Sequence, residues 1–348
     1  MSTTINNCHI LLFPFLAQGH MLPLLHLAHR LSLHGLTITI IITPKNLTYL
    51  SSLLSSHPSS IISLILPFPS HPSIPPGVEN VKDLGHSDDY VWNNIEQLKT
   101  LEQVELSALP GSHVFKSNHL PSLFRLYKKS DPDWEFIKDL KLANTKNWGC
   151  VFNSFDAFEG EYMDYLKKKL SHDWIFGVGP LNLPGPENLG SREDEFENVP
   201  DGFEERVASR GLVIREWAPQ VSILNHEAVG GFLSHCGWNS VLEGIVGGVV
   251  ILAWPMEADQ LVNTRLLVED MGVGVRVCKG AGSVPEAGEL SRVIGESMSK
   301  AGGLKDKAKK LKEKTLEAVS KEGSSVQDMG GLVGELRKLK PLKSRIQV

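Results

Sequence analysis

Residues 217–260 read WAPQVSILNHEAVGGFLSHCGWNSVLEGIVGGVVILAWPMEADQ, and two apolar runs lie in this stretch on either side of a helix-length segment. The first run, GGFLSHCG, is typical of a strand that ends in a tight turn, and WNSVLEGIV is typical of the helix that follows. The second run, GGVVILAW, predicts the next strand. Strands that alternate with helices predict an α/β fold with a parallel sheet covered on both faces.

The turn before this helix predicts a binding site for a diphosphate. The backbone N–H groups near Gly237 to Ser240 would point at the anion, because the first turn of a helix presents free amides and the positive end of its dipole. His235 and Ser240 can add donors from their side chains. Glu243 follows Asn239 by about one helical turn and can accept hydrogen bonds from both hydroxyls of a ribose.

Residues at the two ends of the stretch complete this picture. Trp217 offers a flat face on which a uracil ring can stack, and Gln220 and the backbone of Ala218 can pair with the polar edge of that ring. Asp259 and Gln260 follow the second strand, where sugar hydroxyls would be met. Taken singly, Trp217 is better explained as a core residue, His235 as a buried imidazole and Glu243 as an exposed helix residue. The spacing of the three together favours the binding site.

The 44 residues closely resemble the signature box of plant secondary-product UDP-glycosyltransferases, in WAPQ, in the His of SHCGWNS, in the later Glu and in the terminal DQ. The segments PFLAQGHMLPLLHLA and ITPKN and the C-terminal helices also resemble this family. The resemblance implies the GT-B fold, with two Rossmann-like domains that bind the acceptor (N-terminal) and the nucleotide sugar (C-terminal). It favours glucose as the donor sugar because the box ends in Gln. The UDP-sugar-binding residues that it implies are Trp217, Ala218, Gln220, His235, Gly237, Trp238, Asn239, Ser240, Glu243, Asp259 and Gln260.

His20 is the candidate general base. It falls between an apolar strand at residues 9–15 and a helix at 21–34, where a helix N-terminus favours the neutral imidazole that a base requires. From the residues alone, loop packing and catalysis are equally good readings of His20, and the family context GHMLPL favours catalysis. Neutral His20 would take the proton of the acceptor hydroxyl, whose oxygen would attack the anomeric carbon in line and invert it.

No metal and no cofactor are expected, because the UDP-sugar is a co-substrate. Asp131-Pro132-Asp133 imitates the DxD of metal-dependent glycosyltransferases, but it lacks a preceding strand and its proline is typical of a turn. His26 and His29 share a helix face at a spacing that suits a metal, yet no Cys or carboxylate joins them. These two histidines are expected to be structural.

The chain of 348 residues exceeds what one core usually organises, so two domains are expected. The acceptor domain is predicted at residues 1–182, a linker rich in Pro, Gly and acid at 183–202, the donor domain at 203–338 and a tail at 339–348. Further strands are predicted at 36–43, 61–66, 148–155, 173–180, 211–217 and 272–277. Helices are predicted at 89–109, at 157–170 and throughout 285–338.

Two family segments are missing from the sequence. The family has an aspartate at the end of a strand of the N-terminal domain that orients the histidine, but residues 83–120 hold no matching strand and acid. Asp88 and Asp89 lie in a different local pattern. The first strand and helix of the C-terminal sheet, with their glycine-serine loop, are absent as well. Such losses expose apolar surface and an unpaired sheet edge.

Composition narrows the class of protein. A net charge of -5 gives no reason to expect a nucleic-acid partner, and the four scattered cysteines fit a reducing, cytoplasmic setting. The N-terminal apolar run is too short to span a membrane. A monomer is expected that moves a sugar from a UDP donor to a hydroxyl of a small phenolic acceptor such as a flavonoid.

Three alternatives stay open at this point. The first is a shortened product that binds UDP-sugar with little or no turnover. The second is a dinucleotide-dependent oxidoreductase, which AQGHML disfavours because it lacks the Gly-x-Gly-x-x-Gly spacing. The third is a serine hydrolase, which the absence of a G-x-S-x-G motif disfavours.

Overall fold

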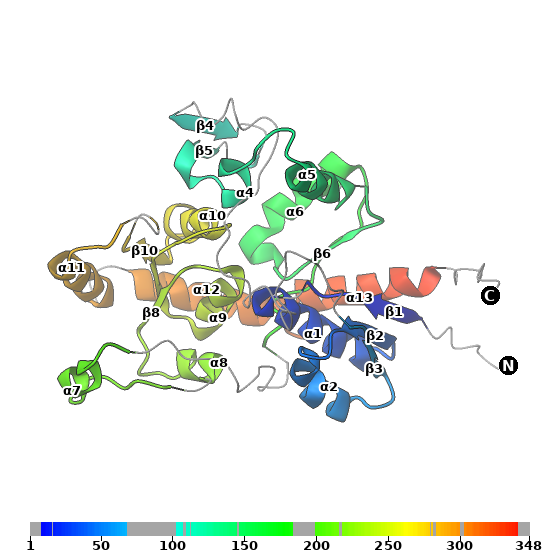
Figure 1. The fold of residues 1–348 in the computed structure, drawn as a ribbon, viewed down its shortest axis with the longest axis horizontal. Helices are drawn as coiled ribbons and strands as arrows, with labels where there is room; N and C mark the ends of the chain where they lie inside the picture. The colour runs from blue at the N-terminus through cyan, green and yellow to red at the C-terminus, as the bar shows by residue number, and fades with distance from the viewer. Residues whose placement is uncertain are drawn as a thin grey trace. The chain divides into compact units, whose positions relative to one another are not determined.

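The structure is a computed structural model. It describes residues 8–15, 17–67, 102–106, 109–111, 113–144, 146–183, 199–215, 218–278, 280, 283–299 and 303–339. The chain divides into two compact units (Figure 1). Unit 1 comprises Met1–Gly85 and Pro184–Ile223, and unit 2 comprises His86–Leu183 and Leu224–Val348.

Unit 1 contains the strand, helix and strand predicted at the N-terminus. Strands β1 (His9–Leu12), β2 (Thr37–Ile42) and β3 (Ile61–Ile65) pair in parallel in the order β1-β2-β3. Helix α1 (Gln18–Leu33) connects the first two strands, and a 3-10 turn (Leu47–Leu50) with helix α2 (Ser51–Ser56) connects the next two. Gly35 follows α1 with φ of 76°, the left-handed conformation that favours glycine after a helix. The predicted β-α-β unit is confirmed.

The apolar core of unit 1 lies between α1 and the sheet. Alternate residues of β2 are buried, and so are the residues of α1 at helical spacing. These buried side chains are Met21, Leu25, Ala28, Leu31, Ile38, Ile40 and Ile42. By contrast, Leu11, Phe13 and Phe15 in and after β1 are 60%, 72% and 61% exposed. Parallel strands are normally covered on both faces. Exposed apolar surface of this kind is the expected result of missing family segments.

Unit 2 contains the sheet predicted from residues 217–260. Strands β8 (Gly231–Ser234), β9 (Val250–Ala253) and β10 (Gly274–Arg276) are parallel, in the order β10-β9-β8. Helix α9 (Trp238–Gly247) follows β8, and α10 (Gln260–Arg265), extended by a π-helical turn η4 (Leu266–Asp270), follows β9. Helix α9 buries Val241, Leu242 and Ile245 in a core that also holds Ile251.

The C-terminal helices pack around the strands of unit 2. They are α11 (Ala287–Met298), α12 (Leu304–Ala318) and α13 (Ser324–Lys338). The prediction of helix throughout 285–338 is therefore wrong at residues 319–323, where the chain turns at Gly323 between α12 and α13. The sheet β6 (Cys150–Phe152) and β7 (Ile175–Gly177), connected by α6 (Asp156–Leu170), is parallel and lies beside α13. The N–H of Gly177 donates to Asp328 Oδ2 over 2.6 Å, and Ser325 Oγ donates to the carbonyl oxygen of Gly179 over 2.5 Å.

These contacts explain why unit 2 takes residues from both sides of the predicted linker. The C-terminal helix returns to the sheet formed by residues 150–177, which is a contact over more than 140 residues of sequence. Composition carries no information about such a long-range contact, so a domain boundary predicted from composition does not include it. The domain limits predicted at 182 and 203 stay a prediction, because the linker residues 184–198 lie outside the described residues.

Two predicted elements are wrong. The helix at 89–109 lies outside the described residues up to 101, but Gln103–Leu106 form strand β4, which pairs antiparallel with β5 (His113–Lys116). The chain reverses between them past Gly111, whose φ is +85°. The strand predicted at 211–217 is irregular over residues 211–215, where Leu212 is 86% exposed, and no described strand pairs with these residues.

The remaining described elements are short helices and one longer helix. They are a 3-10 turn η3 (Ser117–His119), α4 (Ser122–Arg125), α5 (Pro132–Asn144), α7 (Phe203–Val207) and α8 (Gln220–Leu224). No helix in the described ranges has the length and apolarity that a membrane crossing requires.

Candidate functional site

The turn between β8 and α9 has the geometry of an anion site. Cys236 takes φ of +64°, and its N–H donates to Ser234 Oγ over 3.0 Å. The imidazole of His235 lies against Gly237, where a Cβ atom would stand 2.6 Å from Nε2, so only glycine permits this arrangement. Helix α9 begins one residue later, and the N–H groups of its first turn have no acceptor inside the helix. The predicted strand, turn and helix are confirmed.

The side chain of Trp238 anchors the start of α9. Its indole N–H donates to the carbonyl oxygen of Asn153 over 2.9 Å, and its ring stacks on Phe158 at 5.5 Å between centroids. Both partners belong to the segment around β6 and α6. Trp238 can therefore contribute its backbone N–H to a ligand, whereas its ring is engaged in packing.

Glu243 carries a buried carboxylate one turn further along α9. Its Oε2 is buried and accepts no hydrogen bond from the described residues. Burial raises the pKa of this carboxyl to about 7. A buried carboxylate oxygen without a donor is unfavourable for folding, and a hydroxyl of a ribose would supply such a donor. The sequence placed Glu243 correctly on the helix but read it, in isolation, as exposed.

Asp259 and Gln260 stand at the start of α10, beyond the end of β9. Gln260 Oε1 accepts the N–H groups of Met256 and Glu257, over 2.8 and 2.9 Å, and so shapes the loop after the strand. The Asp259 side chain is exposed, and its Oδ2 accepts a hydrogen bond from Asn263 Nδ2 over 2.9 Å. This leaves the Gln260 amide nitrogen as the donor that the residue can offer to a sugar hydroxyl.

Asn263 connects this pair to the anion-binding turn. The buried Nδ2 donates to Asp259 Oδ2 and also to the carbonyl oxygen of Cys236, over 3.0 Å. The sequence reasoning missed Asn263. Its spacing of four residues from Asp259 on a helix was the available signal, but the contact with Cys236 depends on the tertiary fold.

Replacing Asn263 by leucine is expected to lower the free energy of unfolding by about 1–3 kcal/mol, because the buried Cys236 carbonyl loses its donor. Urea denaturation measures this change. The exposed Asn225→Leu variant serves as the control, with an expected change below about 0.5 kcal/mol. Equal stabilities for Asn263→Leu and the wild type would contradict the role given to Asn263.

The other predicted site residues lie in unit 1. His20 is the third residue of α1, its side chain is exposed, and its ring meets Phe15 edge to face at 5.3 Å. No carboxylate among the described residues makes a hydrogen bond or ion pair with it. Ala218 is half-buried and Gln220 exposed at the start of α8; Trp217, Asp88 and Asp89 lie outside the described residues.

The sites considered for metals are occupied by protein contacts. Asp131 Oδ1 accepts the N–H groups of Asp133 and Trp134, so the DPD segment starts helix α5 as a turn. His29 Nδ1 lies 2.7 Å from His57 Nε2, which supports a structural role for His29. In the described part of the chain no three His, Cys, Asp or Glu side chains form a group that could hold a metal. Independence from metal stays a prediction.

Comparison with known proteins identifies relatives along nearly the whole chain. The family model described as UDP-glucoronosyl and UDP-glucosyl transferase matches residues 198–294. UDP-glycosyltransferase 89A2 of Arabidopsis thaliana is 38% identical over 448 residues, which cover 95% of this chain and 96% of that protein. The flavonol 3-O-glucosyltransferase UGT89B1 of the same plant is 36% identical, over 93% of this chain and 95% of that protein.

Solved structures agree with these relatives. The crystal structure of Arabidopsis thaliana UGT89C1 superposes with a TM-score of 0.74 at 31% identity, covering 94% of this chain and 99% of that one. The same protein complexed with quercetin superposes with a TM-score of 0.73 at 33% identity, with the same coverage. The GT-B fold expected from the resemblance is therefore confirmed.

The alignments also confirm that internal segments are missing. The alignment with UDP-glycosyltransferase 89A2 runs over 448 positions, whereas this chain has 348 residues. At least 100 aligned positions (448 minus 348) therefore face gaps in this chain. Which functional groups the gaps remove, including the orienting aspartate and the first strand of the C-terminal sheet, stays a prediction.

Proposed function

Because the chain belongs to the UDP-glucoronosyl and UDP-glucosyl transferase family, we propose that it transfers glucose from UDP-glucose to a hydroxyl of a flavonol or similar phenol. The observation that carries the proposal is Oε2 of half-buried Glu243, a buried oxygen that accepts no hydrogen bond from the described residues, one turn beyond the start of α9. Such a group suits a ligand that brings two hydroxyls.

The donor is held along the segment 217–260. The diphosphate oxygens accept hydrogen bonds from the backbone amides at the start of α9 and from the side chains of His235 and Ser240. The ribose hydroxyls donate hydrogen bonds to Glu243. Trp217 stacks on the uracil, and Ala218 and Gln220 pair with its edge. The sugar hydroxyls meet Asp259 and Gln260, and the terminal glutamine favours glucose.

Transfer then needs a base and a stabilised leaving group. His20 accepts the proton of the acceptor hydroxyl while the oxygen of that hydroxyl forms a bond to the anomeric carbon. The bond from that carbon to the β-phosphate oxygen breaks, and the electron pair leaves with UDP, whose charge the helix amides stabilise. The configuration at the anomeric carbon inverts, and no cofactor takes part. The acceptor binds the N-terminal domain of a cytoplasmic monomer.

Two relatives support a flavonoid acceptor but differ in the sugar that their names give. One relative is named a flavonol 3-O-glucosyltransferase and another a flavonol 7-O-rhamnosyltransferase. UGT89C1 has been solved with UDP-L-rhamnose as well as with quercetin. We propose glucose because of Gln260, and a direct competition between the two donors decides it.

A second candidate function is binding of UDP-sugar without turnover. The gaps in the alignment favour it, because a histidine base without an orienting carboxylate is weakened. The shortened sheet would then keep the donor site at α9 and lose the catalytic machinery.

The test is a product assay with quercetin and radiolabelled UDP-glucose or UDP-rhamnose. We expect a labelled quercetin glycoside, formed faster with UDP-glucose. Saturable binding of UDP-glucose without product would establish the binding function instead. Faster transfer of rhamnose would overturn the donor assignment, and neither binding nor product from folded protein would overturn both functions.

A further inference from the structure

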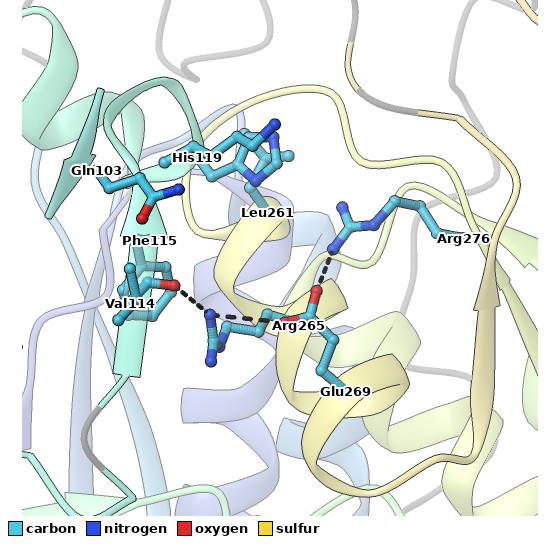
Figure 2. Close-up of a pocket in the computed structure, with 9 residues that line it drawn as sticks. Gln103, Val114, Phe115, His119, Leu261, Arg265, Glu269 and Arg276 are labelled. Atoms are coloured by element: carbon cyan, nitrogen blue, oxygen red, sulfur yellow. Dashed lines mark hydrogen bonds and ion pairs between the residues drawn. The ribbon is translucent and has the colours of Figure 1, made fainter. Parts of the chain in front are cut away.

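A cavity lies in unit 2, lined by residues outside the segment 231–260. It has a volume of about 220 Å³ and is lined by β4, β5, η3, α10, η4 and β10. Figure 2 shows Gln103, His119, Arg265, Glu269 and Arg276 among the lining residues, with ion pairs from Glu269 to both arginines. Each of these residues belongs to unit 2.

Positive charge dominates the lining of this cavity. Three cationic side chains, Lys116, Arg265 and Arg276, line it together with the His119 imidazole and a single carboxylate, Glu269. Glu269 is shared: its Oε2 lies 3.5 Å from Arg265 Nη1 and its Oε1 lies 3.4 Å from Arg276 Nη2. These distances exceed the 2.7–2.9 Å typical of a strong charge-assisted bond. One loosely held carboxylate therefore leaves the cavity with excess positive charge.

Arg265 is held in place by the protein, whereas Arg276 has a buried donor to spare. Arg265 Nη1 donates to the carbonyl oxygen of Val114 over 2.5 Å, and its guanidinium lies 4.7 Å above the ring of Phe115. Arg276 Nη1 is buried and finds no acceptor in the described ranges of the chain. Such a buried donor without a partner is rare in folded proteins.

The titration of His119 reports the same positive field. Burial lowers the pKa of His119 first, and the charges of Arg276 and Lys116 lower it further, while Glu269 acts in the opposite direction. Glu269 thus offsets only part of the positive charge that His119 senses.

We propose that this cavity binds the oxyanion group of a small ligand, either a phosphate or a carboxylate. Guanidinium groups suit both, because their planar donors match pairs of oxygens. The anion would take acceptor positions that Glu269 now fills loosely, and Gln103 and His119 would add further donors. No residue of the turn at His235–Ser240 lines this cavity, so the proposed anion needs no UDP.

Calorimetric titration with inorganic phosphate and with benzoate tests the proposal, with benzyl alcohol as the uncharged control. Phosphate can also bind at the start of α9. The phosphate binding that the Arg276→Gln variant loses is therefore assigned to this cavity. We expect Arg276→Gln to weaken anion binding at least tenfold. Glu269→Gln should strengthen it severalfold, because the competing carboxylate is removed. An Arg292→Gln variant, on the exposed face of α11, should leave it unchanged.

The opposite responses of the two variants keep the test decisive even where Arg276→Gln lowers stability. Binding of phosphate alone would identify a phosphorylated ligand, and binding of benzoate a carboxylate on an apolar body. Equal losses in Arg276→Gln and Arg292→Gln, weaker binding in Glu269→Gln, or no binding of either anion would each overturn the proposal.

Discussion

Replacing Glu243 by glutamine is expected to stabilise the protein above pH 7 and to weaken UDP binding at least tenfold. The native pKa of this carboxyl is about 7, and the usual value is 4.5. Between these values the native state holds a proton that the unfolded state has released, so stability falls as pH rises from 4.5 through 7. The loss is fully present above pH 7 and amounts to about 1–3 kcal/mol. Glutamine does not ionise and escapes this loss.

Urea denaturation at pH 5 and pH 8 measures the first effect. The free energy of unfolding is expected to fall between pH 5 and pH 8 in the wild type, and to fall by less in the Glu243→Gln variant. Glu313→Gln on the exposed face of α12 is the matched control and should behave as the wild type. UDP titration measures the second effect, which arises because glutamine offers one uncharged acceptor oxygen where the carboxylate offers two charged ones. A variant with unchanged UDP affinity would contradict the role given to Glu243.

Replacing His20 by alanine is expected to reduce the rate of glycoside formation by at least about 100-fold, the contribution typical of a general base. UDP affinity should stay within about twofold, because the donor residues lie in the segment 217–260 and not on α1. The readouts are initial rates with quercetin at saturating UDP-glucose, and calorimetry with UDP.

His34→Ala is the matched control for this variant, since His34 is exposed at the other end of α1. It should keep the wild-type rate. A His20→Ala variant with full activity would remove the proposed base, whereas a parallel loss in both variants would indicate damage to the helix rather than to catalysis.

The elements predicted well from sequence are those whose signal is local. β8, its turn and α9 follow from an apolar run, Gly237 and a helical pattern, all within 17 residues. The strand predicted at 211–217 failed because an apolar run forms a strand only beside a partner, and Leu212 has none among the described residues. β4 was read as helix because its pairing with β5 is tertiary and its four residues carry little periodicity.

The candidate site shows the same limit. Sequence spacing placed His235, Ser240 and Glu243 on one turn and helix, but it could not show that the Trp238 indole is engaged with Asn153 or that Asn263 holds Cys236. These contacts join residues 27 to 85 positions apart. Trp217 and residues 68–101 fall outside the described residues.

Titration calorimetry with UDP tests the central claim most directly, namely that a nucleoside diphosphate binds at the start of α9. We predict saturable heat for one UDP per folded chain, with no requirement for a divalent metal. The absence of heat from protein that unfolds cooperatively in urea would contradict the assignment of the donor site.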